Sequence, residues 1–360
     1  MRSPNQGDGT TDRSETPMPF PPHHPGARLD SVLFLALALV LLLSAFAGHD
    51  APAVPGAGAA VIPPARAPAG PHVDLPAGSA GTHASPTKWL PSGKGMWIYL
   101  PEKTEGGNVA AIVAKAQATG LTHLWVRMGS AWDGFNVAPF MDRLLPSAHA
   151  AGLKVIGWDF PKLDPMGPDI ERARAMINYR TPGGHGIDAF SPDIEGPAEG
   201  TRLTPGNARR YGAALREVAG PDYTLIVTVP RPSKERPTHP YDDIVAGYDA
   251  IAPMIYWLDR QPDTDVAGAL HHLSRYNVPL YPVGQAYDGS PEGGRRGVPP
   301  PEELFRFMRV AESHGAAGVS FWSWQAANQA AWNAVRDAVE FRSPAASATV
   351  MATAGHGFTP

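Results

Sequence analysis

The sequence predicts an α/β protein whose main part is a (β/α)8 TIM barrel, preceded by a transmembrane or signal segment and a disordered Pro/Ala-rich linker. Eight short β-rich runs alternate with longer helical stretches between Gly95 and Glu340. Barrels of this kind commonly occupy about 250 residues, which matches that span. No glycine-rich phosphate turn follows the first run, whereas an open doubly wound sheet usually carries one there.

Composition excludes several functional classes. The chain has 360 residues, with 30 basic and 34 acidic side chains and a net charge of -4. Without a long basic run there is no footprint for nucleic acid, so no nucleic-acid partner is expected. There is no cysteine, which excludes disulfides, thiolate metal sites and thiol nucleophiles. The oligomeric state is left open.

The N-terminal region predicts export. After a short polar segment, residues 1–30, residues 31–48 read SVLFLALALVLLLSAFAG without a polar face. The run is slightly shorter than the about 20 residues that span a bilayer. It ends in Ala45-Phe46-Ala47, a pattern that signal peptidase cleaves. Cleavage would release the protein, and an uncleaved segment would anchor it in the membrane, so we expect an extracellular or cell-envelope location.

Two segments flank the barrel, which we place at residues 94–341. Residues 49–93 are rich in Ala, Pro and Gly and predict a disordered linker, because they contain few large apolar side chains. Residues 342–360 are similarly small and polar and predict a disordered tail.

The eight β-rich runs define the predicted barrel strands. They are Gly95–Leu100, His123–Met128, Lys154–Phe160, Ile187–Glu195, Tyr223–Pro230, Ala250–Trp257, Pro279–Tyr287 and Gly318–Trp324. Apolar residues recur at helical spacing in Asn108–Thr119, Asp169–Tyr179, Thr204–Ala219, Pro301–His314 and Asn328–Phe341. Glycines that can end a helix follow several such stretches, at Gly120, Gly152, Gly220 and Gly315.

Acidic and aromatic side chains gather at the predicted C-terminal strand ends, where barrel enzymes keep their reactive groups. Aromatic faces suit the C–H surface of sugar rings, and acids and amides suit their hydroxyls. The candidate substrate-binding residues are Arg127, Trp158, Asp159, Trp257, Gln285, Tyr287, Trp322 and Trp324. For Arg127 and Asp159 a mutual ion pair is an open alternative, and the two late tryptophans could simply fill the mouth of the barrel.

The fourth run carries the sharpest chemical signal. In a strand Ser191, Asp193 and Glu195 share one face and Asp188 lies on the other. The α-carbons of Asp193 and Glu195 would then lie about 6.6 Å apart, so each carboxylate raises the pKa of the other toward the range of a general acid. The alternative is that both acids are surface charges at the start of a helix.

This run resembles the D-x-x-D-x-D-x-E signature of the chitinase-like family 18 glycoside hydrolases, with Asp188, Asp193 and Glu195 at three of its four acids. Met254-Ile-Tyr256 is similar to that family's M-x-Y, and Trp322 or Trp324 to its barrel-floor tryptophan. The resemblance implies substrate-assisted hydrolysis of an N-acetylhexosamine polysaccharide, peptidoglycan or chitin-like, without a cofactor. Glu195 would be the acid, Asp193 would orient the substrate amide, and Tyr256 would hydrogen-bond to it.

The sequence departs from that pattern in places that leave rivals open. Ser191 replaces one acid, Trp257 replaces an acidic or amide residue, and Pro192 can mark a bulge. A D-x-E ending also resembles family 25 lysozymes, but their first-strand acid has no counterpart here.

Three further readings follow from the residues alone. A two-carboxylate glycosidase could pair Glu195 with Asp259 or Asp288. A non-catalytic carbohydrate-binding barrel held at the cell wall is the rival outside the enzymes. A metal site is not expected, since the doublets His23-His24 and His271-His272 point apart.

Overall fold

The computed structural model describes residues 88–341. The expected polar segment 1–30, the apolar run 31–48, most of the linker 49–93 and the tail 342–360 lie outside these residues. Among the helices of residues 88–341, none combines the length and apolarity needed to cross a membrane.

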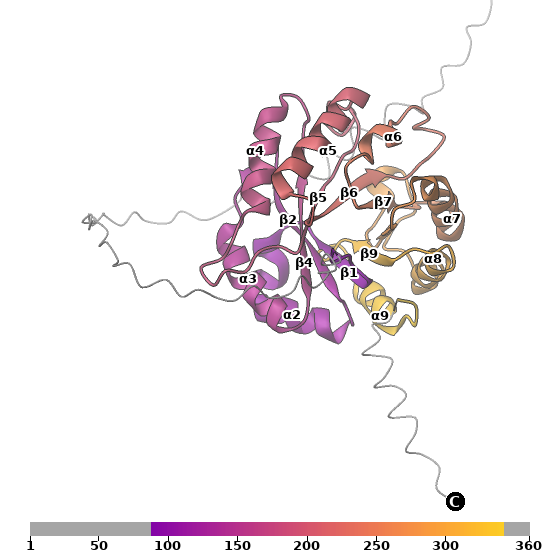
Figure 1. Cartoon of the computed structure of the whole chain (residues 1–360). Helices are drawn as coiled ribbons and strands as arrows, with labels where there is room; N and C mark the ends of the chain where they lie inside the picture. Colours follow the sequence, from indigo (N-terminus) through magenta and orange to yellow (C-terminus); the bar gives the residue numbers. More distant parts are fainter. Residues whose placement is uncertain (1–87, 342–360) are drawn as a thin grey trace, which may run out of the picture.

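Eight parallel strands close into a barrel, as the alternation of runs predicted (Figure 1). The first strand, β1, pairs with β2 on one side and with the last strand, β9, on the other, so the barrel wall is continuous. A short ninth strand, β3 (Gly134–Phe135), runs antiparallel to the end of β2. The barrel strands are β1 (Gly93–Ile98), β2 (His123–Ser130), β4 (Lys154–Phe160), β5 (Ala189–Pro192), β6 (Thr224–Pro230), β7 (Ala250–Ile255), β8 (Val283–Gln285) and β9 (Gly318–Trp322).

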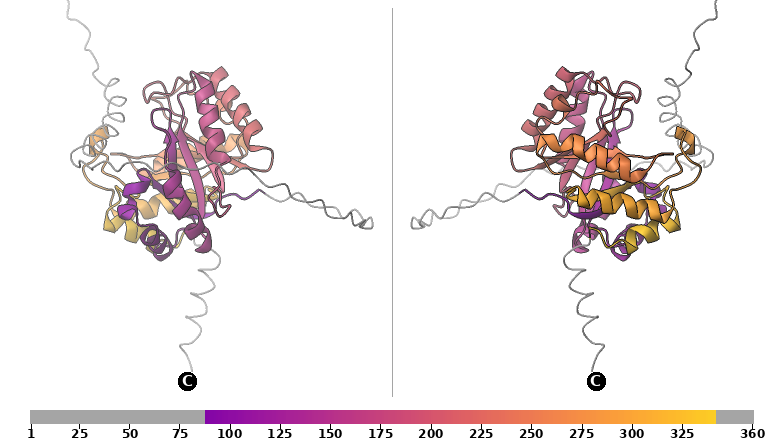
Figure 2. Two further views of the ribbon diagram at one scale, coloured as in Figure 1. Left: turned by 90° about the vertical axis from the view of Figure 1, so that its left-hand side faces the viewer. Right: turned by 90° about the vertical axis from the view of Figure 1, so that its right-hand side faces the viewer.

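Helices surround the barrel on its outer side, which Figures 1 and 2 show from three directions. The α-helices are α2 (Val109–Ala118), α3 (Ala138–Ala150), α4 (Met166–Ile177), α5 (Pro205–Ala219), α6 (Tyr241–Ile244), α7 (Pro262–Leu273), α8 (Pro301–Ser313) and α9 (Gln329–Asp337). Three short 3-10 helices, η1 (Pro101–Gly107), η2 (Ser274–Tyr276) and η3 (Ser290–Glu292), lie in the connections.

The helix ends follow the expected local chemistry. The side chain of Asn108 accepts a hydrogen bond from the backbone N–H of Ala111 and so caps α2. Thr204 caps α5 in the same way through Asn207. Gly120, after α2, has a φ of 71°, a backbone conformation that residues with a β-carbon rarely adopt. Side-chain caps therefore fix where α2 and α5 begin.

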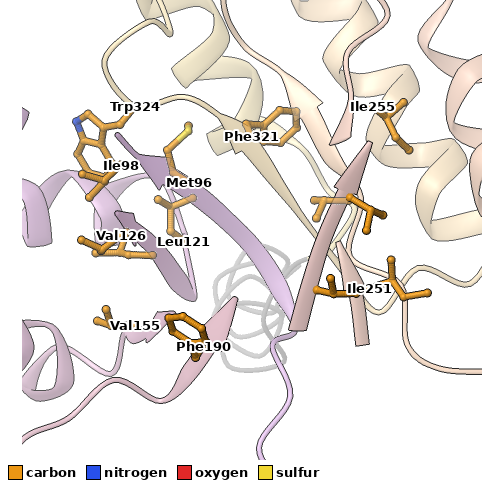
Figure 3. Close-up of a cluster of buried hydrophobic side chains, with 14 of the residues drawn as sticks. Met96, Ile98, Leu121, Val126, Val155, Phe190, Ile251, Ile255, Phe321 and Trp324 are labelled. Atoms are coloured by element: carbon orange, nitrogen blue, oxygen red, sulfur yellow. The ribbon is translucent and has the colours of Figure 1, made fainter. Parts of the chain in front are cut away.

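An apolar layer fills the space between the barrel wall and the helices (Figure 3). Strand residues Ile98, Val126, Phe190, Ile255 and Phe321 are fully buried in this layer. Since successive residues of a strand alternate between its two faces, the residues next to these point into the barrel. This alternation sets the side-chain directions within the strands, as far as the barrel mouth, the end where the strands finish.

The barrel interior is packed with indole rings. Trp97 stacks on Trp125 with ring centres 4.5 Å apart and meets Trp158 at 5.5 Å. Small residues on the opposite strands, Ala189 and Ala252 among them, leave room for these rings. Large and small side chains thus complement one another across the interior, which is a packed core and not a pore.

The floor of the barrel, at the N-terminal ends of the strands, is closed by residues that the sequence placed in the linker. Lys88 forms an ion pair with Asp249 at 2.6 Å, just before β7. Trp89 and Leu90 pack against the interior cluster, and the ammonium of Lys154 lies over the ring of Trp89 at 5.7 Å. Residues 88–90, which were predicted to belong to the linker, are therefore packed against the barrel.

Candidate active site

Strand β5 is shorter than expected. The predicted strand Ile187–Glu195 forms a ladder only over Ala189–Pro192, and its last residue, Pro192, has no N–H to donate. Beyond it the chain still bonds to both neighbours: Asp193 N–H donates to Asp159 O at 2.8 Å and Ile194 N–H donates to Thr228 O at 2.9 Å. Backbone bonds to β4 and β6 thus hold the two following acids at the barrel mouth.

The two faces of β5 carry different chemistry. Ser191 faces Thr228, with the two hydroxyl oxygens 2.8 Å apart. Asp188, on the other face, accepts bonds from His149, Lys154 and the backbone of Val155. The first acid of the D-x-x-D-x-D-x-E pattern therefore joins neighbouring elements near the barrel floor and does not reach the mouth.

Asp193 is a buried acid, and one of its carboxyl oxygens has no hydrogen-bond partner in the protein. Its residue is 7% exposed, and its Oδ1 is buried without a hydrogen-bond partner. Burial raises the pKa of Asp193 to about 8, and the negative charges of Glu199 and Asp159 add to the effect. Because an unpaired buried carboxyl oxygen costs stability, its retention fits a group that awaits a ligand.

Glu195 lies beside Asp193 and is 5% exposed. Burial raises the pKa of Glu195 well above its usual range, and the charges of Asp193 and Glu199 raise it further, while Arg236 opposes them. A raised pKa favours the protonated form of this carboxyl, which is the form in which a general acid acts.

Three charged residues near this pair were not predicted as site residues from the sequence. Glu199 accepts a bond from the Gly196 N–H at 3.0 Å and pairs with Arg236, which comes from the loop after β6. Glu292, in the loop after β8, accepts a bond from the Tyr287 hydroxyl at 2.9 Å. Each lies in a loop without periodicity, so only the folded chain shows that they surround Glu195.

Tyr256 and Tyr287 are two aromatic residues close to the acid pair Asp193 and Glu195. Their rings meet edge to face with centres 5.3 Å apart and an interplanar angle of 89°. Burial raises the pKa of Tyr256 well above its usual range, and the charges of Asp193 and Glu195 act in the same direction. The Tyr256 hydroxyl is therefore protonated and lies within the field of both acids, where it can donate a hydrogen bond.

A second aromatic group lies across the top of the interior. Trp322 is half-buried, and its ring centre is 5.6 Å from that of Trp158, which is 2% exposed. The Arg127 guanidinium lies 5.0 Å from the ring centre of Tyr99 and pairs with Asp133. Trp322 is the indole of this group with accessible surface, and Trp158 supports it from below.

Several residues expected to bind substrate have other partners instead. Asp159 is fully buried and accepts two bonds from Arg172, at 2.9 and 2.8 Å, so the alternative pair with Arg127 is not formed. Gln285 is 1% exposed and accepts a bond from the Leu258 N–H at 2.8 Å. These two side chains hold neighbouring segments in place and present no free group to a ligand.

Two of the expected tryptophans point into the outer layer. Trp257 follows the inward-facing Tyr256 and so points outward, where its Nε1–H donates to Glu303 at 2.7 Å. Trp324 lies beyond the end of β9 and donates to Glu105 at 2.9 Å. The structure therefore places neither ring at the mouth, and of the candidates for the barrel-floor tryptophan only Trp322 faces the interior.

The structure also shows the positions of Asp259 and Asp288, the alternative partners for Glu195, and of the doublet His271-His272. Asp259 is exposed, and Asp288 accepts bonds from the N–H groups of Ser290 and Gly297. Neither contributes to the charges that shift the pKa of Glu195. His271 is exposed, and within residues 88–341 no three His, Asp or Glu side chains are arranged to hold a metal ion.

Together these features define a TIM barrel with a buried acid pair at the C-terminal ends of its strands, beside tyrosine and tryptophan rings. No family model matches the sequence, and no curated protein matches it either.

Solved structures share the fold. A chitinase from Bacteroides thetaiotaomicron is 12% identical with a TM-score of 0.53, over 68% of this chain and 95% of that one. The PgaB (BpsB) glycoside hydrolase domain from Bordetella bronchiseptica is 13% identical with a TM-score of 0.50, over 70% and 100%. The spore cortex-lytic enzyme SleL from Bacillus cereus is 12% identical with a TM-score of 0.50, over 70% and 75%. The resemblance to glycoside hydrolases is thus confirmed at the level of the barrel fold.

Proposed function

We propose that this protein is an exported glycoside hydrolase that cleaves N-acetylhexosamine-containing polysaccharide, with peptidoglycan as the first candidate and a chitin-like polymer as the second. The observation that carries the proposal is the pair Asp193 and Glu195, buried side by side at the strand ends with raised pKa values. The barrel shared with a chitinase, a PgaB domain and a cortex-lytic enzyme supports it.

The chemistry follows from the positions of these groups. Glu195 donates its proton to the glycosidic oxygen while the bond from that oxygen to the anomeric carbon breaks. The carbonyl oxygen of the substrate's own N-acetyl group bonds to the anomeric carbon, and Asp193 Oδ1, which has no partner in the protein, accepts the amide N–H. The Tyr256 hydroxyl donates to the same acetyl group. Water then attacks the anomeric carbon while the bond from that carbon to the acetyl oxygen breaks, which restores the N-acetyl group, and the water gives a proton to the Glu195 carboxylate.

Ser191 bears directly on this mechanism. Its hydroxyl is engaged with Thr228, so no acid along β5 competes for Asp193. The proton of Asp193 is held by burial and by the charges of Glu199 and Asp159 instead. An N-acetyl amide would therefore supply the hydrogen bond that Asp193 lacks.

The test is release of reducing ends from wall glycan and from chitin oligomers by the full chain. Glu195→Gln keeps the shape of the side chain and removes the proton that it donates, so we expect turnover to fall at least about 1000-fold. Asp259→Asn, an exposed acid on the next loop but one, is the matched control. Unchanged turnover in Glu195→Gln would reject the assignment.

The same assay separates the enzyme from a carbohydrate-binding barrel held at the cell wall. That rival is favoured by Ser191 and by Trp257, which depart from the glycosidase pattern. Both proteins would bind glycan, but only the enzyme creates new reducing ends. The anchor or signal role of residues 31–48 belongs to the proposal as well, and detection of the protein in a culture's membrane or medium fraction tests it.

A further inference from the structure

The chain makes a closed turn directly after Glu195. The carbonyl oxygen of Gly196 accepts hydrogen bonds from the N–H groups of Glu199 and Thr201, both at 3.1 Å. Thr201 is fully buried, and its hydroxyl donates to the Pro161 carbonyl at 3.2 Å, which joins the turn to the end of β4. The backbone that follows the acid is therefore held both within the turn and by the neighbouring strand.

The carboxylate of Glu199 lies against the inside of this turn. Its Oε2 accepts the Gly196 N–H at 3.0 Å, and the guanidinium of Arg236, from the loop after β6, donates to both carboxylate oxygens. A β-carbon at position 196 would lie 3.0 Å from Glu199 Oε2 and 3.1 Å from Arg236 Nη1. Because glycine has no β-carbon, the ion pair can approach the peptide bond that follows Glu195 this closely.

The two members of the ion pair differ in exposure. Glu199 is 5% exposed, whereas the Arg236 side chain is 33% exposed. A buried carboxylate depends on its partner, but a partly exposed guanidinium can still be hydrated when the partner is removed. A neutral side chain at position 199 would therefore leave a charged Arg236 close to Glu195.

The charges of the ion pair act on the two acids. Burial and then Asp193 raise the pKa of Glu195 most, Glu199 raises it further, and Arg236 lowers it. Burial and then Glu199 also raise the pKa of Asp193. Since Glu199 acts in the same direction on both acids, removal of its charge favours the ionised form of either one.

Other titratable groups surround the acids and the ion pair. They are Asp159, His239, Tyr241, Tyr256, Tyr287 and Glu292. Burial and then Arg236 lower the pKa of His239 to about 4, and burial raises the pKa values of the three tyrosines. The histidine is therefore neutral and the tyrosines are protonated between about pH 6 and pH 9. Asp159 is held by Arg172, and Glu292 accepts the Tyr287 hydroxyl.

We propose that Glu199 and Arg236 are positioning residues for the reaction: their ion pair holds the Glu195 carboxyl at the barrel mouth, and the charge of Glu199 keeps the proton on the acid pair. The inference rests on the proposed function, because it assigns the ion pair a part in the step that Glu195 performs. In this role neither residue contacts the glycan.

The test is the pH dependence of kcat/KM for wall glycan or chitin oligomers, measured with the full chain. Glu199→Gln keeps an oxygen for the Gly196 N–H and removes the negative charge. The alkaline limb of the profile, where the acid pair loses its proton, should therefore move to lower pH by at least about 0.5 unit. KM should stay within about 2-fold, since no contact with the glycan is lost.

The double substitution Glu199→Gln/Arg236→Gln removes both charges. Its alkaline limb should lie between those of the unmodified protein and of Glu199→Gln, because the lowering effect of Arg236 is also gone. The double variant leaves no unpaired charge, so it keeps the test available where the single variant is unstable. In that case its limb should still lie at lower pH than that of the unmodified protein.

Glu303→Gln on α8 is the matched control. Glu303 is also 5% exposed and pairs with an arginine, Arg295, at 2.6 Å, but it does not contribute to the charges that shift the pKa of Glu195. Its alkaline limb should coincide with that of the unmodified protein. A limb that stays in place or moves to higher pH in Glu199→Gln would overturn the proposal, as would an equal shift in the control.

A titration without substrate separates this proposal from the proposed function. In protein labelled with 13C at the glutamate carboxyl, the Glu195 signal is identified by its absence in Glu195→Gln. We expect this signal to titrate at lower pH in Glu199→Gln than in the unmodified protein. If it does so but no glycan is cleaved, hydrolysis is rejected and the effect of the ion pair on Glu195 stands. If glycan is cleaved and the signal titrates at the same pH in both proteins, the positioning role alone is rejected.

Discussion

Asp193 should destabilise the folded protein in a way that depends on pH, and Asp193→Asn isolates the effect. The pKa of the folded-state carboxyl is about 8, whereas an aspartate in an unfolded chain has a pKa of about 4. Between these values the unfolded chain releases the proton and the folded chain keeps it. The stability of the fold therefore falls as the pH rises from about 4 through about 8.

The magnitude follows from the two pKa values. Linkage gives a loss of about 1–2 kcal/mol at pH 5 and at most about 5 kcal/mol at pH 8 from this one group. An asparagine has the shape of the protonated aspartate and does not titrate. Asp193→Asn should therefore raise the free energy of unfolding by about 1–2 kcal/mol at pH 5 and by up to about 5 kcal/mol at pH 8.

Urea unfolding at the two pH values measures this difference. Asp259→Asn, an exposed acid, should change the free energy of unfolding by less than about 0.5 kcal/mol at either pH. A gain for Asp193→Asn that is the same at pH 5 and pH 8, or a loss at pH 8, would refute the reasoning. A pH-dependent gain together with lost glycan cleavage would show an acid kept for function at the expense of stability.

Two other substitutions test the floor and the rim of the barrel. Asp188 is partly buried, but bonds from His149, Lys154 and the Val155 N–H hold its pKa below the usual range, so its stabilising effect is present above about pH 4 and is lost as the pH falls. Asp188→Asn should lower the free energy of unfolding by about 1–3 kcal/mol at pH 7 and by less at pH 3, and equal losses at both would contradict this. Trp132, at the C-terminal end of β2, is 52% exposed, and Trp132→Ala should weaken glycan binding about 2- to 10-fold with little change in stability. Val339→Ala removes the other large exposed apolar side chain among residues 88–341, at 67%, and should not affect glycan binding.

The barrel could be predicted from the sequence because its strands and helices have different periodicities. The runs that became β2, β4 and β9 start at the predicted residues, and α5 and α8 lie within one residue of the predicted stretches. The direction of Asp188 also followed from the two-residue repeat. Local propensity and hydrophobic spacing were sufficient for these features, because each is decided within a few residues.

The side chains at the mouth were harder to predict, because their directions are decided where the strands end. Trp257 comes directly after an inward-facing tyrosine and so joins the outer layer, while Trp324 follows the last residue of β9 and turns toward Glu105. Asp159 is taken up by Arg172, a partner on α4 that no local pattern identifies. The pairing of Glu199 with Arg236 joins two loops 37 residues apart, so it depends on the closed barrel.

The closed floor of the barrel determines which side of the domain stays accessible when the protein is tethered or immobilised. Lys88 reaches Asp249 and the Thr224 hydroxyl donates to the Trp89 carbonyl at the start of β6, while at the other end of the described chain Phe341 lies beside Gly93, where β1 begins. Residues 88 and 341, the ends of the described chain, thus both lie on the side away from the acids. A tether, a fused partner or a solid support held at this floor would leave the side that carries the acid pair directed outward and accessible to a large insoluble polymer.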